Sequence, residues 1–222
     1  MYFPTAKKAK LKDFQSLSLQ IVFNGPRFAN NQALVPFRRE GEHWEALVPL
    51  REKGVLYAIF TIKDDQTNAV DDNGGQYWDV VFCNPPGEKS PNGLLSQARS
   101  YTGESWPLNI RREKDVAKAI SLLETAAAAN SNSWPRMMLL TTLWEYKAKR
   151  DGDDAAAYAK LAPEIERYLD GHLEDRNTQS SGGNFVVRHA EKLPADFVER
   201  TITKLDAKVD RKYSFRAALA YH

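Results

Sequence analysis

The sequence has a single cysteine, Cys83, no long apolar run and almost no net charge. One cysteine excludes an internal disulfide. The longest apolar stretches are too short to cross a membrane, and residues 1–16 lack the apolar core of a signal peptide. The formal net charge is only +2, so the positive excess that neutralises nucleic-acid phosphates is missing. We therefore expect no membrane span and no nucleic-acid partner.

Sequence motifs for catalysis, metal binding and phosphate binding are also missing. The histidines have no metal-ligand spacing, being scattered at His43, His172, His189 and His222. The acidic residues of positions 64–72 do not fit a calcium loop. Neither a Gly-rich phosphate loop nor a serine nucleophile elbow is present. The sequence therefore predicts a non-enzymatic protein with no metal and no cofactor.

The first part of the chain, residues 1–85, has the two-residue hydrophobic period of β-strands. Strands are predicted over Leu17–Val22, Ala33–Phe37, His43–Leu50, Val55–Ile62 and Gln76–Cys83. Short links with no intervening helix are typical of an antiparallel β-sandwich. Residues 63–75 have the composition of a polar loop. The consecutive prolines within residues 84–92 indicate a linker, because they fit neither a strand nor a helix interior.

Beyond the linker, residues 93–222 have the 3.6-residue period of amphipathic helices. Helices are predicted over Glu113–Ala129 and Trp134–Arg150, from Asp154 with a kink or restart at Pro163, and over about 194–209 and 211–220. Residues 174–184 have loop composition. The first and third helices begin roughly 40 residues apart, near the spacing of two-helix repeats. We therefore expect an α+β protein, with an antiparallel sandwich over 1–85 and a bundle of helical hairpins over 93–222.

The turn before the last predicted strand is the main candidate for ligand contact. Asn73-Gly74 favours a tight turn, since both residues tolerate positive φ. Tyr77 and Trp78 follow, and aromatic rings beside polar side chains are what sugar recognition uses, although plain hairpins share the pattern. Side chains alternate along a strand, so Tyr77 and Trp78 are expected on opposite faces. Trp78 is then the ligand residue only if Tyr77 packs inward.

The predicted sandwich also resembles a known family. The residues that carry the resemblance are His43-Trp44-Glu45, the aromatic-rich run Tyr57–Asp64 and the turn Asp71–Tyr77. Over about residues 15–83 they resemble the immunoglobulin-like starch-binding modules, which have Asn where this chain has Asp72. The resemblance implies an Ig-like sandwich that binds a glucan-like carbohydrate. Its ligand residues would be Trp44, Asp72, Asn73, Tyr77 and Trp78, with Asp72 and Asn73 supplying hydrogen bonds.

The whole layout resembles the N-terminal region of exported thioredoxin-like (TlpA-type) bacterial proteins, in which a similar sandwich precedes helical hairpins. Their Cys-x-x-Cys redox domain is absent here. This resemblance implies a periplasmic or other extracytoplasmic location. Two functions stay open: a carbohydrate-binding sandwich attached to a helical scaffold, or a protein-interaction scaffold or accessory region. In the second, exposed aromatics such as Trp134 or Tyr146 on a TPR-like helical part contact a protein partner.

Overall fold

The protein divides into two compact units, unit 1 over Met1–Asp115 and unit 2 over Val116–His222. The structure, a computed structural model, describes residues 1–3, 9–11, 14–25, 28–49, 54–84, 87–103, 112–208 and 214–220. An N-terminal antiparallel β region is followed by helices, so the predicted α+β class is confirmed. Within these residues, no helix has both the length and the apolar character needed to cross a membrane.

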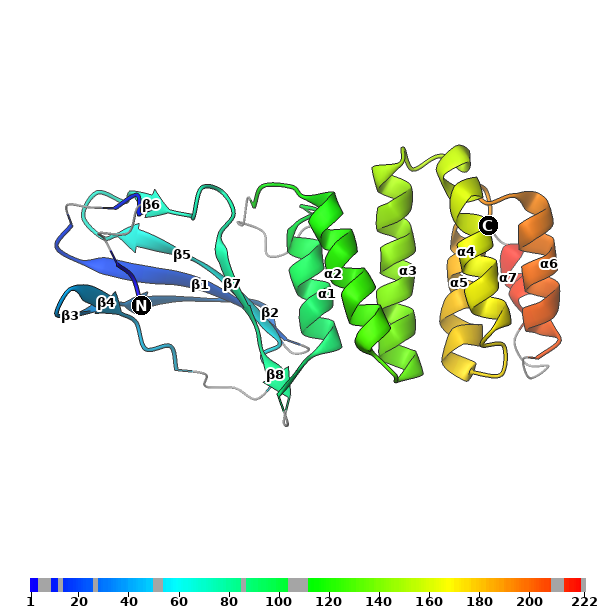
Figure 1. Ribbon diagram of the computed structural model, residues 1–222, viewed down its shortest axis with the longest axis horizontal. Helices are drawn as coiled ribbons and strands as arrows, with labels where there is room; N and C mark the ends of the chain where they lie inside the picture. Colours follow the sequence, from blue (N-terminus) through cyan, green and yellow to red (C-terminus); the bar gives the residue numbers. More distant parts are fainter. Residues whose placement is uncertain are drawn as a thin grey trace. The chain divides into compact units, whose positions relative to one another are not determined.

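Unit 1 is built on a five-stranded antiparallel sheet (Figure 1). The order is β2 (Phe28–Pro36), β1 (Leu17–Gly25), β5 (Tyr57–Asp64) and β6 (Val70–Asp71), and β7 (Trp78–Val81) also pairs with β5. β5 is therefore an inner strand, as its continuous apolar run predicts. β1 is the other inner strand, hydrogen-bonded to β2 on one side and to β5 on the other.

Apolar side chains are buried on both faces of this sheet. One face, here called the hairpin face, carries Leu17, Leu19, Ile21, Ala58 and Ile62. The opposite face, here called the helix face, carries Val22, Tyr57, Ile59 and Val81. Two buried faces require cover on two sides, because each exposed apolar square ångström costs about 25 cal/mol.

The helix face is covered by α1 (Pro91–Ser100), which contacts β1, β5 and β7. Leu94 of this helix packs onto the apolar cluster of the helix face. The boundary between the two units consequently falls after Asp115, beyond the segment 84–92 that the sequence predicts as a linker. Pro91 and Gly93 belong to a helix that docks on the sheet, and Pro85 and Pro86 lie outside the described residues.

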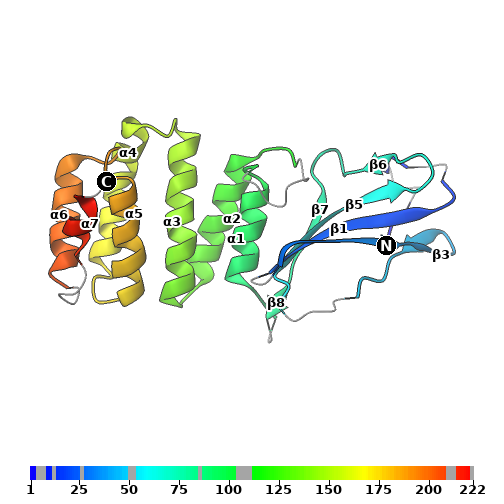
Figure 2. The same ribbon diagram turned by 180° about the vertical axis from the view of Figure 1, so that it is seen from behind.

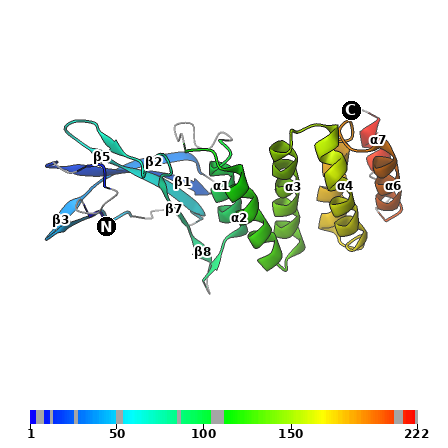
Figure 3. The same ribbon diagram turned by 45° about the horizontal axis from the view of Figure 1, so that its top comes forward.

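A short second layer covers part of the hairpin face. It consists of β3 (Arg38–Glu40) paired with β4 (His43–Glu45), and Figure 3 shows β3 to one side of the sheet. Trp44, Ala46 and Val48, which alternate along the chain, pack against the hairpin face. The predicted strand over His43–Leu50 is wrong for residues 46–49, and Leu50 lies outside the described residues. In the part of unit 1 that the structure describes, this layer does not close into a sandwich.

Several other strand boundaries differ from prediction for local reasons. The predicted loop 63–75 contains β6. The strand predicted over Gln76–Cys83 begins only at Trp78, because Tyr77 has a φ of 55°. The predicted linker contains β8 (Cys83–Asn84), which pairs with β9 (Glu88–Lys89) before α1 begins. Pro91 is the first residue of that helix, where a missing N–H costs nothing.

Unit 2 contains helices that stand beside one another, with α3 between α2 and α4 (Figure 2). They are α2 (Val116–Ala129), α3 (Ser133–Arg150), α4 (Ala155–Asp170), α5 (Gly183–Arg188), α6 (Ala195–Asp206) and α7 (Phe215–Leu219). Their shared core includes Trp144, Ile165 and Phe185. α4 runs through Pro163 as one element, so the predicted restart is wrong. Lengths from 18 residues in α3 to 5 in α7 show no regular repeat.

The predicted loop at 174–184 is also wrong. Thr178–Gly182 form a π-helix, η1, that continues into α5. The Asp175 carboxylate accepts hydrogen bonds from the backbone N–H and the hydroxyl of Thr178, at 2.7 and 2.6 Å. A Cβ on Gly182 would lie 2.4 Å from the Leu169 side chain. The small residues that suggested a loop are therefore a requirement of close packing.

A methyl group at Gly93 is expected to loosen α1 from the sheet. A Cβ there would lie 2.4 Å from the Leu56 carbonyl oxygen and 2.9 Å from the Val81 side chain. Overpacking costs about 1–3 kcal/mol, and contact with backbone lies at the upper end, so it outweighs the gain of about 1 kcal/mol in helix propensity. Hydrogen exchange of the β7 amides should accelerate in Gly93→Ala and not in Asn92→Ala, whose side chain is exposed. Equal protection in the two variants would rule out the close contact.

Candidate functional site

The residues predicted to bind sugar lie in different places on unit 1. Trp44 and Trp78 pack on the hairpin face. Tyr77 packs on the helix face. Tyr77 and Trp78 therefore occupy opposite faces, as predicted, even though Tyr77 lies outside β7. Asp72 and Asn73 lie in the turn between β6 and β7.

Both tryptophan rings of the predicted site are partly buried. The Trp78 ring stacks on Phe60 with centroids 6.1 Å apart and an interplanar angle of 15°. The Trp44 ring meets Phe14 edge-on at 5.2 Å. Each ring contributes to the core of unit 1 and keeps part of its surface accessible.

The carboxylates of the turn hold the N-terminal residues. Asp72 forms an ion pair with Lys10, and the hydrogen bond from Lys10 lowers the pKa of Asp72 against the opposing effect of burial. The neighbouring Asp71 is fully buried and accepts hydrogen bonds from the Tyr2 hydroxyl and the Lys10 backbone N–H, both at 2.9 Å. Burial raises the pKa of Tyr2 to about 12, so its hydroxyl remains a donor.

The turn between β6 and β7 adopts left-handed backbone conformations. The φ angles are 55° at Asn73, 69° at Gly74, 83° at Gly75 and 55° at Tyr77. Asn and Gly adopt this region readily, whereas a bulky aromatic residue does so at a cost. The Tyr77 N–H donates to the Asp72 carbonyl at 2.7 Å, and the Asn73 side-chain amide donates to the Tyr77 carbonyl at 3.3 Å. These bonds hold the strained residue and turn its ring toward the helix face.

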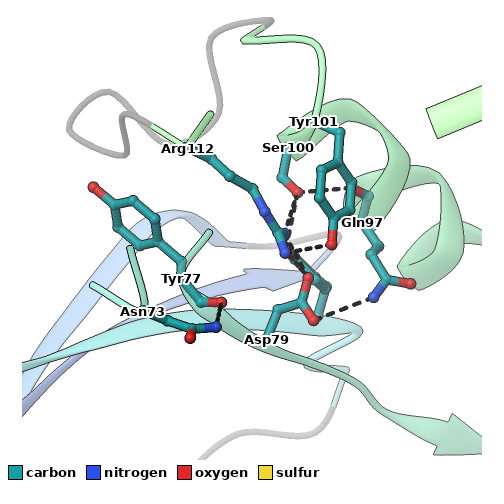
Figure 4. A network of polar contacts seen from close by, with 8 residues as sticks. Asn73, Tyr77, Asp79, Gln97, Ser100, Tyr101 and Arg112 are labelled. Atoms are coloured by element: carbon teal, nitrogen blue, oxygen red, sulfur yellow. Dashed lines mark hydrogen bonds and ion pairs between the residues drawn. The ribbon is translucent and has the colours of Figure 1, made fainter. Parts of the chain in front are cut away.

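A buried polar cluster surrounds Arg112 (Figure 4). Its guanidinium carbon lies 3.6 Å from the centroid of the Tyr101 ring. Nη1 donates to Asp79 at 2.6 Å, to the Ser100 hydroxyl at 2.9 Å and to the Tyr57 hydroxyl at 3.3 Å. Nη2 donates to the Tyr101 hydroxyl. One planar cation thereby joins β5, β7 and α1.

The other members of this cluster donate hydrogen bonds to the Asp79 carboxylate. The Tyr57 hydroxyl donates to Asp79 Oδ2 at 3.0 Å, and the Gln97 amide donates to Oδ1 at 3.2 Å. Burial raises the pKa of Tyr57 strongly, so the phenol is a neutral hydrogen-bond donor. The Arg112 and Asp79 side chains are 4% and 14% exposed. The cluster uses its polar groups to fasten α1 and the segment after it to the sheet.

An apolar cavity of about 270 Å³ opens on the hairpin face, between the sheet and the second layer. All of its lining residues are apolar, among them Phe23, Phe37, Val48, Phe60 and Phe82. Apolar side chains suit an apolar group better than a sugar, whose hydroxyls need hydrogen-bond partners.

Unit 2 carries an open groove of about 360 Å³ between α2, α3 and α4. α3 lines it with residues spaced by four, three and four positions, which lie on one helix face. The lining residues from α3 are Arg136, Leu140, Leu143 and Lys147. The other walls are Glu124, Ala127 and Ala128 of α2, and Glu164 and Tyr168 of α4 with His172 after it. The groove therefore has an apolar floor and charged ends.

At one end of the groove a lysine lies between two carboxylates. Lys147 Nζ is 3.2 Å from Glu124 and 3.1 Å from Glu164. Glu164 also accepts a hydrogen bond from the indole N–H of Trp144 at 3.2 Å, which fixes its position. One cation and two anions leave this end with one net negative charge.

At the other end the charged group is a guanidinium. Arg136 Nε donates to the Ala127 carbonyl at 3.2 Å. His172 Nδ1 lies 2.8 Å from the Tyr168 carbonyl, and because a carbonyl only accepts, that nitrogen carries a proton. The His172 ring also stacks on the Tyr168 ring at 4.3 Å. This end of the groove is therefore cationic.

A second polar cluster in unit 2 joins Tyr158, His189 and Glu145. The Tyr158 hydroxyl lies 3.0 Å from His189 Nδ1, and His189 Nε2 lies 3.3 Å from Glu145. Burial raises the pKa of Tyr158 to about 12, so this phenol is not an activated nucleophile. The His189 ring packs on Phe185 at 4.6 Å, which gives the cluster a place in the core.

The sequence reasoning missed both the Arg112 cluster and the groove. The cluster joins residues from three elements, so no local spacing in the sequence predicts it. The groove had a visible signal, since Arg136 and Lys147 flank the apolar stripe of α3 at helical spacing. Among the residues that the structure describes, no group of three or more His, Cys, Asp or Glu side chains is placed to hold a metal ion.

Comparisons with protein-family models, curated proteins and solved structures found no match to this chain.

Removing Arg112 is expected to destabilise unit 1 by about 3–5 kcal/mol, because a buried carboxylate is left without its cation. The double variant Arg112→Met with Asp79→Leu should lose less than Arg112→Met alone, since no charge then stays buried. Lys10→Ala, in an exposed ion pair of the same unit, should cost under about 1 kcal/mol. Hydrogen exchange of the β5 amides measures each loss. Additive losses in the double variant would show that the two charges are not coupled.

Proposed function

We propose that this chain is a non-catalytic binding protein that holds a polypeptide partner in the groove between α2, α3 and α4. The observation that carries this proposal is the lining of the groove, an apolar floor between two charged ends. Apolar centres with polar rims are the usual anatomy of protein interfaces. Packed helices commonly present concave surfaces to extended partners.

Two accessible side chains of unit 2 support a polypeptide partner. Trp134, near the start of α3, is 57% exposed, and it lies on a different face of the helix from Arg136, because residues two apart do not share a face. Exposed tryptophans are common anchors in protein interfaces. Tyr146, the other aromatic that the sequence suggested, is fully buried and has a core role. On the opposite wall, the exposed Ala128 leaves room for a partner side chain.

The absence of catalysis is part of the proposal. In the cluster around Arg112 and in the cluster around His189, the polar side chains form hydrogen bonds with other members of the same cluster. The raised pKa values of Tyr57 and Tyr158 keep both phenols protonated at neutral pH. These features support structural roles for the clusters.

We also propose an Ig-like sandwich for unit 1 and a TPR-like arrangement for unit 2. The packing of Trp44, Ala46 and Val48 over the hairpin face supports two layers. Contacts between consecutive helices α2, α3 and α4 support hairpins. The resemblance to exported thioredoxin-like proteins supports an extracytoplasmic location.

A glucan-like carbohydrate on unit 1 is the second candidate ligand. The observation that favours it is the placement of the Trp44 and Trp78 rings, both on the hairpin face and both partly accessible. Tyr77 lies on the opposite face and takes no part in this version of the site. A shallow site of this kind gives weak binding, on the order of 0.1–1 mM.

Filling the groove is expected to abolish partner binding. Ala128→Trp places a large side chain in the groove from an exposed position. Ala129→Trp makes the same change at the next position, which is exposed and outside the lining. Partners captured by the immobilised full chain should be reduced at least tenfold by the first variant and unchanged by the second. Equal capture by both variants would end the proposal that the groove is the binding site.

The carbohydrate candidate predicts a saturable change in tryptophan fluorescence when maltooligosaccharides are added. We expect a dissociation constant of about 0.1–1 mM that is lost in Trp44→Ala and Trp78→Ala. Trp134→Ala, on unit 2, is the matched control and should keep the response. Circular dichroism reports whether each variant is folded. No saturation at millimolar sugar would remove carbohydrate from consideration.

A further inference from the structure

We infer that the groove selects an extended peptide segment with an acidic residue at one end, an apolar residue in the middle and a basic residue at the other end. This inference rests on the proposed function and adds the chemical pattern of the partner. It follows from the order of charges along the three helices that line the groove.

The charges of the groove lie in a fixed order along α3. Arg136 and Lys147 are eleven residues apart on one helix face, with Leu140 and Leu143 between them. At 1.5 Å per residue, eleven residues span about 16 Å. An extended chain advances about 3.3 Å per residue, so about five residues of a bound segment would cover that distance.

The lysine end of the groove attracts a basic side chain. The Lys147 side chain is 15% exposed, whereas those of Glu124 and Glu164 are 50% and 38% exposed. The cation is thus the least accessible of the three, and the accessible groups are two carboxylates. A lysine or arginine of the partner meets one net negative charge there.

The arginine end attracts an acidic side chain. Arg136 comes from α3, and Tyr168 and His172 come from the end of α4 and the residues after it. Asp175 is outside the groove lining, and its carboxylate accepts two hydrogen bonds from Thr178. A guanidinium gives a carboxylate paired hydrogen bonds that a neutral group cannot match.

The middle of the groove takes an apolar side chain. Its floor is Leu140 and Leu143, and its α2 wall is made of alanines. A nucleic acid would meet the two glutamates, and a neutral sugar would use neither charged end. The combination of opposite charges about five residues apart with an apolar centre is a peptide pattern.

The test is fluorescence anisotropy of dye-labelled seven-residue peptides added to the full chain. All peptides share a leucine-containing centre and differ at two positions that are five residues apart. These positions carry Glu and Lys, two Glu, two Lys or two Gln. The Glu and Lys peptide should bind at least tenfold more tightly than each of the others.

A charge reversal provides a gain of binding that misfolding cannot imitate. Glu124→Lys makes the negative end of the groove positive, so the preferred peptide should become the one with two Glu. Glu199→Lys is the matched control, because it makes the same change at an exposed position of α6 outside the groove. It should leave the preference for the Glu and Lys peptide unchanged.

Two results would overturn the inference while the proposed function stands. One is binding of all four peptides with equal affinity that Ala128→Trp abolishes. The other is no binding of any peptide by a chain whose partner capture still depends on Ala128. If partner capture is indifferent to Ala128→Trp, the proposed function itself fails.

Discussion

The structure of unit 1 depends on the burial of one ion pair, between Arg112 and Asp79. Two charges taken out of water need hydrogen bonds to their polar atoms. Here Tyr57, Ser100 and Gln97 supply such bonds, and of the guanidinium only Nε is buried without a partner. Because these residues come from β5 and α1, meeting that requirement fixes α1 on the helix face. The covered sheet can then bury apolar residues on both of its faces.

Local patterns predicted the elements that carry their own signal. β1 and β5 followed from apolar alternation and an apolar run, and α2, α3, α4 and α6 from the helical period. The sequence did not predict α1, because Pro91, Asn92 and Gly93 at its start resemble a linker. The stability of this helix comes from its docking on the sheet. The sequence did not predict η1 and α5 either. Their glycines allow close packing against Leu169 and Phe215, and this packing exists only in the folded chain.

In the candidate sites, too, only local features were predictable from the sequence. Strand periodicity predicted that Tyr77 and Trp78 lie on opposite faces of the sheet, and Trp44 lies on the same face as Trp78. The pairing of Asp72 with Lys10 joins residues 62 positions apart, so no local pattern contains it. It changes the chemistry of the turn, because the carboxylate predicted as a sugar ligand also forms an ion pair with Lys10.

The net charge of +2 gave no hint of a binding surface, because opposite charges cancel in a sum and not in space. In the groove of unit 2 both cations come from α3, and the carboxylates of Glu124 in α2 and Glu164 in α4 flank only one of them, Lys147. Complementary charges at such a surface contribute more to the choice and orientation of a partner than to affinity. An apolar floor supplies attraction without direction, so the charged ends are what give this groove a polarity. A segment laid in reverse meets like charges at both ends, and the groove thereby distinguishes the direction of a chain as well as its composition.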